Sequence, residues 1–319
     1  MHLKDVGRVD VQKEAVLVLG KIFSEEEGKM SDKSVGDAFS ALGDKGVLES
    51  AAGASAAALM TNILADYGFL LERDNALVIK SICKRVGTPK ALHDQEANTF
   101  LALLNNLTTS ETNCIAVADS LIEKGTMALM AKNFLDYNPQ MEDETYPADA
   151  EWDAEDNWQF MGPILCNFAR VENIRTFLFQ RFDQNYIAPL LKQIRSKNPT
   201  RRRGVVATLR TLLFKNECHW RLVVEENCCL HLMLPLVVSH ETFEEVSPFS
   251  DYDKNGMDVL LSLKEDVEGK TYEQDENTLC LILDCLRLLC VKRVIRYELR
   301  KQKLYPVLRN LDLALTENE

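Results

Sequence analysis

The stretch QNYIAPLLKQIRSKNPTRRRGVVATLRTLLF, Gln184 to Phe214, reads as two helices joined by a turn. Its first part carries apolar residues at the three- and four-residue spacing that marks one face of a helix, at Ile187, Leu190, Leu191 and Ile194. Asn-Pro then signals a turn, and Thr200 is a candidate cap for the long helix from Arg201 onward. Such a helix pair cannot cover its own apolar face, so the stretch predicts neighbours that stack against it.

The same helical spacing continues through the 319 residues, and sustained alternation of apolar and polar residues is missing. Glycine and proline stand mostly between the apolar runs, where they serve as turn signals. No glycine-rich turn between a strand and a helix occurs. The sequence therefore predicts an all-α protein.

One motif recurs along the chain, an apolar helix with Leu-x-Asn-apolar near its centre. The asparagine position is held in turn by Asn62, Asn106, Asn167, Thr211 and Leu288, and an earlier candidate is Lys21. Successive positions from Lys21 onward are 41, 44, 61, 44 and 77 residues apart. Three of these intervals lie close to the repeat of roughly 40–47 residues that armadillo and HEAT proteins show.

Two acidic segments account for the two long intervals, residues 138–157 and residues 239–277. We therefore predict a single solenoid over residues 1–319, an armadillo/HEAT-like right-handed superhelix of stacked helical repeats with two acidic insertions. The insertions cannot bury much apolar area, so we expect them to leave the solenoid. The alternative is that aromatic residues fix them to its surface, namely Trp152, Trp158 and Phe243.

The asparagine position suggests where a partner binds. In an armadillo layout the third helices line the concave face, and this position commonly bonds an extended peptide or an adjoining helix. Asn62, Asn106, Asn167 and Thr211 are therefore binding candidates. We keep open the alternative that the asparagines satisfy backbone groups between repeats, because a polar residue in the middle of a helix must find a partner.

Three arginines, Arg201 to Arg203, stand at a helix start, where the helix dipole favours acidic residues. Successive residues differ in direction by about 100°, so the three cannot all face one partner, whereas Arg203 and Arg210 should share a face. We expect the basic residues here to recognise an acidic or phosphate-rich partner: Lys192, Arg195, Arg201, Arg202, Arg203 and Arg210. The alternative is that the arginines pair with the acidic insertions.

Composition limits the function classes further. With 37 basic and 49 acidic residues the net charge is −12, which argues against a general nucleic-acid binder. The longest apolar run, Cys228–Val238, is too short to span a bilayer, and the start of the sequence shows no signal-peptide pattern. Nine cysteines, mostly within apolar helical patterns such as that around Cys280, indicate reduced thiols. We expect a cytoplasmic monomer.

Residues for catalysis do not assemble into a recognisable site. The five histidines form no H-E-x-x-H pair, and neither G-x-S-x-G nor G-x-G-x-x-G occurs. One cluster has zinc-ligand residue types without the familiar paired spacing, which favours core packing over metal binding: Cys218, His219, Cys228, Cys229 and His231. We expect no enzymatic activity, no cofactor and no metal.

Four stretches resemble, in order, the Hgh1 (Hgh-one) family of eukaryotic armadillo-like proteins, named historically after brain protein sixteen. They are NWQFMGPILCNFAR (157–170), the arginine helix, LMLPLV (232–237) and LRKQKLYPVLRNL (299–311). The resemblance implies a chaperone adaptor that engages translation elongation factor 2 during folding and links it to the cytosolic chaperonin. Thr211 departs from the asparagine usual in the family, and a Tyr-Leu-Pro-Pro-Asp-Lys-like run is missing. The alternative is a general armadillo adaptor for a native partner in signalling, transport or Hsp70 nucleotide exchange.

Overall fold

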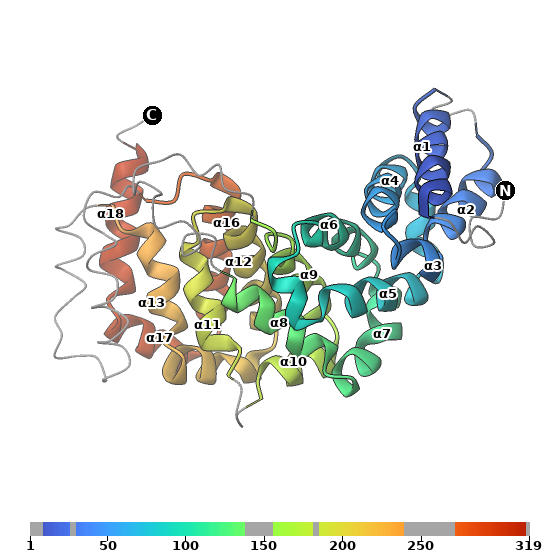
Figure 1. Ribbon diagram of the computed structural model, residues 1–319. Coiled ribbons are helices and arrows are strands. Elements are labelled where there is room, and N and C mark those ends of the chain that lie inside the picture. The colour runs from blue at the N-terminus through green and yellow to red at the C-terminus, as the bar shows by residue number, and fades with distance from the viewer. Residues whose placement is uncertain (1–8, 26–29, 138–155, 181–184, 239–271, 317–319) are drawn as a thin grey trace. The chain divides into compact units, whose positions relative to one another are not determined.

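The computed structural model describes residues 9–25, 30–137, 156–180, 185–238 and 272–316. Every regular element in these ranges is a helix, which confirms the all-α prediction (Figure 1). The chain divides into two compact units, Met1–Phe177 and Leu178–Glu319. None of the described helices has both the length and the apolar character needed to cross a membrane.

The first unit is a series of short helices. They are α1 (Val9–Glu25), α2 (Asp32–Leu42), α3 (Lys45–Leu48), α4 (Gly53–Asp66), η2 (Gly68–Glu72), α5 (Ala76–Val86), η3 (Pro89–His93), α6 (Ala97–Leu107), α7 (Glu111–Glu123), α8 (Thr126–Asp136), α9 (Met161–Phe168) and α10 (Glu172–Leu178), which ends at the unit boundary. Ser31 and Ser110 begin α2 and α7 by accepting backbone N–H groups three residues further on.

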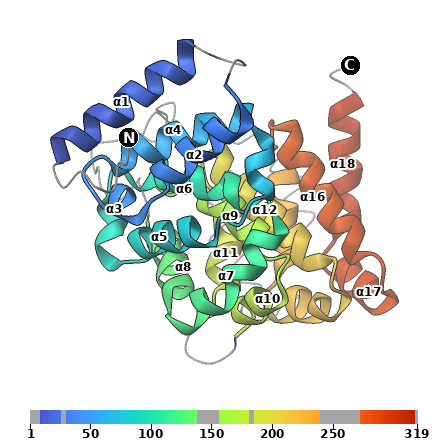
Figure 2. The same cartoon turned by 90° about the vertical axis from the view of Figure 1, so that its right-hand side faces the viewer.

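The motif helices of this unit pack against one another in sequence. Helix α4 packs on α6 and α6 on α9, while α1 lies against α4 (Figures 1 and 2). Their apolar faces are buried, with Met60, Phe100, Leu104 and Phe168 all inaccessible to water. The recurrence of the motif therefore corresponds to a row of helices that share one core.

The second unit follows the same plan. Its elements are α11 (Ile187–Lys192), η4 (Gln193–Arg195), α12 (Pro199–Leu213), η5 (Asn216–Cys218), the π-helical turn η6 (Arg221–Glu225), α13 (Cys228–Met233), η7 (Leu234–Leu236), α16 (Glu276–Leu289), α17 (Arg293–Lys301) and α18 (Leu304–Thr316). Its two motif helices, α12 and α16, pack side by side (Figure 1).

The helix–turn–helix pair predicted from Gln184 to Phe214 is present, but its cap differs. Asn198 begins α12, since its Oδ1 accepts the backbone N–H of Arg201 at 3.0 Å. Pro199 occupies the first turn, where its missing N–H costs nothing. Thr200 lies inside the helix, so the prediction that it caps α12 is wrong.

Four motif helices end in the same way. At each helix end a backbone carbonyl accepts a hydrogen bond from the side chain six residues further on. The pairs are Thr108 with Cys114 Sγ (3.1 Å), Ala169 with Arg175 Nη1 (3.1 Å), Leu213 with His219 Nε2 (2.7 Å) and Cys290 with Arg296 Nη1 (2.7 Å). These carbonyls lie two positions after the motif residues and repeat their spacings of 61, 44 and 77 residues. Helix ends leave carbonyls without intrahelical partners, so the repeat supplies a donor at each end. The same type of hydrogen bond therefore recurs at the spacing of the sequence motif.

The two predicted insertions coincide largely with residues outside the described ranges. Trp152 and Phe243 fall among them, whereas Trp158 is fully buried where the chain enters α9. Helix α16 begins at Glu276, so the second insertion ends slightly earlier than the predicted residue 277.

The nine cysteines are free thiols, and five of them are buried. Burial raises the pKa of Cys114 to about 11 and that of Cys228 to about 12, so both stay protonated at neutral pH. Of the others, Cys166, Cys218 and Cys290 are half-buried, and Cys280 lies on the exposed side of α16.

Candidate protein-interaction site

The asparagine candidates lie on the stacked helices of the first unit. Asn62 belongs to α4, Asn106 to α6 and Asn167 to α9. Asn62 is exposed, and the other two are half-buried. The sequence motif therefore places one amide on each helix of the row.

Asn167 is held by the neighbouring helix. Its Nδ2 donates to the carbonyl oxygen of Asn105 at 3.2 Å and to the hydroxyl of Thr108 at 3.1 Å. The alternative stated for these asparagines, that they bond backbone groups between repeats, therefore holds for Asn167.

Arg170 strengthens the same junction and was missed in the sequence. Its Nη2 donates to the carbonyl oxygens of Thr108 and Thr109 at 2.7 and 2.9 Å, and its Nε donates to Asn167 O at 3.0 Å. A cation among carbonyls at the end of α6 is also favoured by the helix dipole. Its position three residues after the motif asparagine, on the same helical side, was the available signal.

Most of the hydrogen-bonding groups of the Asn62 and Asn106 side chains have no partner within the described ranges. Asn106 accepts one long hydrogen bond, 3.5 Å from the side chain of Asn105. The Asn62 side chain makes no hydrogen bond with any residue in the described ranges. A side-chain amide offers two N–H donors and one carbonyl acceptor, which is the complement of a peptide backbone.

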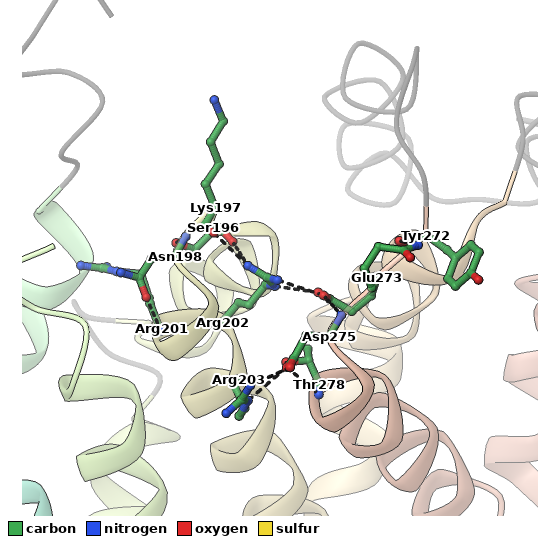
Figure 3. A network of polar contacts seen from close by, with 11 residues as sticks. Ser196, Lys197, Asn198, Arg201, Arg202, Arg203, Tyr272, Glu273, Asp275 and Thr278 are labelled. Atoms are coloured by element: carbon green, nitrogen blue, oxygen red, sulfur yellow. Dashed lines mark hydrogen bonds and ion pairs between the residues drawn. The ribbon is translucent and has the colours of Figure 1, made fainter. Parts of the chain in front are cut away.

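The three arginines of α12 point in different directions, as predicted (Figure 3). Arg201 is 2% exposed, and its Nη1 donates to Gln193 Oε1 at 3.2 Å. Arg202 forms a bidentate pair with Glu273, with nitrogen–oxygen distances of 2.6 and 2.9 Å. Arg203 pairs with Asp275 in the same two-pronged way, at 3.1 and 2.6 Å.

These pairs match the alternative stated for the arginines, pairing with the second acidic insertion. Glu273 and Asp275 belong to the last residues of the predicted second insertion, directly before α16. Arg202 also donates to the backbone carbonyls of Ser196 and Lys197 in the turn before its own helix. Arg202 and Arg203 therefore fix the end of the acidic segment to α12.

Arg210 continues the same face, as its spacing from Arg203 predicts. Its Nε donates to Asp284 of α16 at 2.9 Å, and its guanidinium lies 5.2 Å from the ring centre of Phe214. The shared face is thus directed at α16. Thr211 donates within its own helix, to Ala207 O at 3.0 Å.

Lys192 and Arg195 lie near a different neighbour, the buried His231 of α13, whose pKa they help to lower. Lys192 is exposed and Arg195 is half-buried. Arg203 and Arg210 of α12 contact Asp275 and α16, so the basic residues of this region face two different neighbours.

Asp275 connects the arginine face to the start of α16. Its side chain accepts the backbone N–H of Thr278 at 3.0 Å and so caps that helix. The hydrogen bond from Arg203, followed by those from Thr278, lowers the pKa of Asp275 to about 2. The carboxylate therefore stays charged throughout the physiological range.

Four of the five residues of the cysteine–histidine cluster are packed in the core, as favoured from its spacing, and Cys218 is half-buried. His219, Cys228 and Cys229 are inaccessible to water, and His231 is 4% exposed. Within the described ranges, no three or more His, Cys, Asp or Glu side chains are grouped for a metal ion. The Nε2 of His219 carries the proton, because the Leu213 carbonyl can only accept.

Replacing Glu273 by Gln should lower the free energy of unfolding by about 2 kcal/mol, because it removes the charge that Arg202 pairs with in a partly buried site. The Glu273 side chain is 7% exposed and that of Arg202 is 18% exposed. Urea denaturation followed by circular dichroism measures the loss. Glu217→Gln, at an exposed position of η5, is the matched control. An equal loss in both variants would show that the pair contributes nothing specific.

The fold and these contacts define a class, a protein that is all-helical in its described ranges and whose motif helices are joined by polar side chains. A family model described as "Domain of unknown function (DUF383)" matches residues 91–280, which is more than half of the chain. The chain belongs to this family, and its curated relatives show it to be the Hgh1 family.

Three relatives illustrate the similarity, each named Protein HGH1 homolog. The one from Xenopus tropicalis is 27% identical over 217 residues, covering 67% of this chain and 54% of the relative. The Schizosaccharomyces pombe protein is 28% identical over 169 residues, 51% of this chain and 45% of its own length. The Danio rerio protein is 31% identical over 152 residues, 47% and 38% respectively. The chain spans about half the length of the curated relatives it matches.

Proposed function

We propose that the chain is a non-enzymatic chaperone adaptor that acts as a cytoplasmic monomer. Its client would be translation elongation factor 2 during folding, and it would link this client to the cytosolic chaperonin. Membership of the Hgh1 family carries the proposal. We further propose that the stacked helices form an armadillo-like right-handed superhelix, with the motif helices along its binding face.

The amides of Asn62 and Asn106 support this proposal physically. A chain that has not finished folding exposes peptide groups without partners, and unpaired backbone groups are costly to bury. An asparagine amide can donate to a backbone carbonyl and accept from a backbone N–H at once. Two such amides on neighbouring helices suit an extended segment whatever its side chains are. Asn167 and the paired arginines are assigned to the adaptor's own structure.

The test is the capture of elongation factor 2 from translating cytosol. A variant with Asn62→Ala and Asn106→Ala should capture about tenfold less newly made factor, since two hydrogen bonds contribute about 1.5 kcal/mol in total. Its melting temperature should match the wild type, because neither side chain is in the core. Asn216→Ala, at an exposed position of the second unit, is the control.

Each outcome separates the competing functions. Equal capture by the double variant would exclude the amide contact, while failure of the wild type to capture newly made factor would exclude the client. Capture of mature factor in preference to newly made factor would favour the alternative, an armadillo adaptor or scaffold for a native partner.

A further inference from the structure

A groove crosses the first unit on helices other than the motif row. It has a volume of about 580 Å³ and runs along α5, between the α2–α3 segment and the junction of α7 with α8. This volume lies within the range of about 300–1,000 Å³ that binding pockets commonly have. The groove is therefore large enough to take several side chains of a partner.

One apolar side chain that lines the groove is largely exposed to water. Leu77 of α5 is 80% exposed although it lines a concave surface, and Val78 lies beside it. Ser81 follows one helical turn after Leu77 and also lines the groove. An apolar group from a partner would remove Leu77 from water, which is favourable in proportion to the area covered.

Lysines from three helices also line the groove. Lys45 comes from α3, Lys80 and Lys84 from α5, and Lys124 from the end of α7. Lys84 forms an ion pair with Glu49 at 3.4 Å. The side chains of Lys45, Lys80 and Lys124 make no ion pair or hydrogen bond with the residues that the structure describes.

The acidic residues of the groove have local bonding partners instead. Asp44 accepts the N–H of Gly46 at 2.9 Å, and Asp74 accepts the N–H of Ala76 at 3.0 Å at the start of α5. The positive end of the α5 dipole offsets part of the Asp74 charge. The groove is thus lined by four lysines and three carboxylates, and Lys45, Lys80 and Lys124 form no ion pair within the described ranges, in a protein whose net charge is −12.

We propose that this groove docks an acidic peptide segment of a partner protein, with an apolar side chain of the segment on Leu77 and its carboxylates facing Lys45, Lys80 and Lys124. The three lysines stand on separate helices, so they match carboxylates spread along a chain better than the clustered charge of a single phosphate. The groove lies on α5, whereas the proposed client contacts lie on α4 and α6. The docking role is therefore independent of the client proposal.

The test uses the full chain and a fluorescein-labelled peptide, Asp-Glu-Leu-Glu-Asp-Leu-Asp-Glu, followed by fluorescence anisotropy. The peptide should bind, and binding should weaken as salt rises, because exposed charges are screened. A variant with Lys80→Glu and Lys124→Glu should bind about tenfold more weakly, since each reversal replaces an attraction by a repulsion. Leu77→Ser should weaken binding about fivefold through the lost apolar contact.

Matched changes outside the groove provide the controls. Lys132→Glu alters an exposed lysine of α8, and Ile115→Ser alters an exposed apolar residue of α7. Both should leave peptide binding unchanged. The proposal fails if the controls weaken binding as much as the groove variants. It also fails if the same peptide with Asn and Gln for its acids binds equally well, or if oligouridylate RNA binds the groove and the acidic peptide does not. Because no elongation factor is present, these results stand apart from the client experiment.

Discussion

Trp158→Ala should lower the free energy of unfolding by about 3–5 kcal/mol, the range found when large aromatic side chains are removed from cores. Trp158 is inaccessible to water, and its indole Nε1 donates to the carbonyl oxygen of Leu92 at 3.3 Å. Its backbone N–H donates to Asp156 Oδ1 at 2.9 Å. The substitution removes apolar packing and leaves a carbonyl without its donor. Domains are commonly stable by only 5–15 kcal/mol, so the first unit should approach unfolding at room temperature.

Two further variants separate packing from the hydrogen bond. Trp158→Phe keeps much of the apolar volume and loses the indole donor, so its loss should be smaller, about 2 kcal/mol. Trp220→Ala, at a position that is 49% exposed, should change stability by less than about 1 kcal/mol. Urea denaturation followed by circular dichroism measures all three. If Trp158→Ala proves as mild as Trp220→Ala, the tryptophan does not anchor the chain where the first acidic segment ends.

The helices and their repeat could be predicted because both are local properties of the chain. The apolar spacing from Ile187 to Ile194 places α11 and η4 correctly, and Asn-Pro marks the turn that follows. The residue that caps α12 could also be identified from the neighbouring sequence. Asn198 and Thr200 are both capping residue types, but Pro199 belongs in the first turn, which makes the residue before it the cap.

The partners of the polar side chains could not be predicted in the same way. Helical geometry predicts that Arg203 and Arg210 share a face, but it does not say what that face meets. Asp275 and Asp284 are 72 and 74 residues further along the chain than the arginines that they bind. Such pairs depend on how α12 and α16 pack. The sequence could only supply two alternatives, recognition of a partner or pairing with the acidic segment.

The asparagine row shows the same limit. The motif predicts one amide on each stacked helix, and the structure confirms this for Asn62, Asn106 and Asn167. It does not predict that the Asn167 side chain donates hydrogen bonds to Asn105 and Thr108, since these contacts depend on the offset between α6 and α9. The groove on α5 could not be predicted from the sequence for a related reason. Its lysines lie far apart in the sequence and meet only because α3, α5 and α7 pack together.

The stability of the second unit should fall by about 3 kcal/mol between pH 7 and pH 4 because of His231 alone. Desolvation by burial, followed by the nearby charges of Arg195 and Lys192, lowers the pKa of His231 from 6.5 to about 4. Its Nδ1 is buried without a hydrogen-bond partner in the described structure, so nothing there compensates a proton on the ring. The unfolded chain takes up the proton as pH falls through 6.5, whereas the folded chain does not until about pH 4. The stability of a fold that keeps His231 uncharged is therefore fully present above pH 6.5 and is lost as pH falls toward 4.

Carboxylates titrate in part of the same range, so the prediction rests on the difference between wild type and His231→Gln, which has no titrating ring. The glutamine variant starts less stable at pH 7, because the imidazole packing is lost, but its stability should decline less steeply between pH 6.5 and pH 4. The difference in slope should amount to about 3 kcal/mol over that interval. Urea denaturation at a series of pH values gives both curves. His93→Gln, at an exposed histidine of η3 in the first unit, is the control variant. Parallel curves for wild type and His231→Gln would mean that water or a structural rearrangement solvates His231 as it becomes charged.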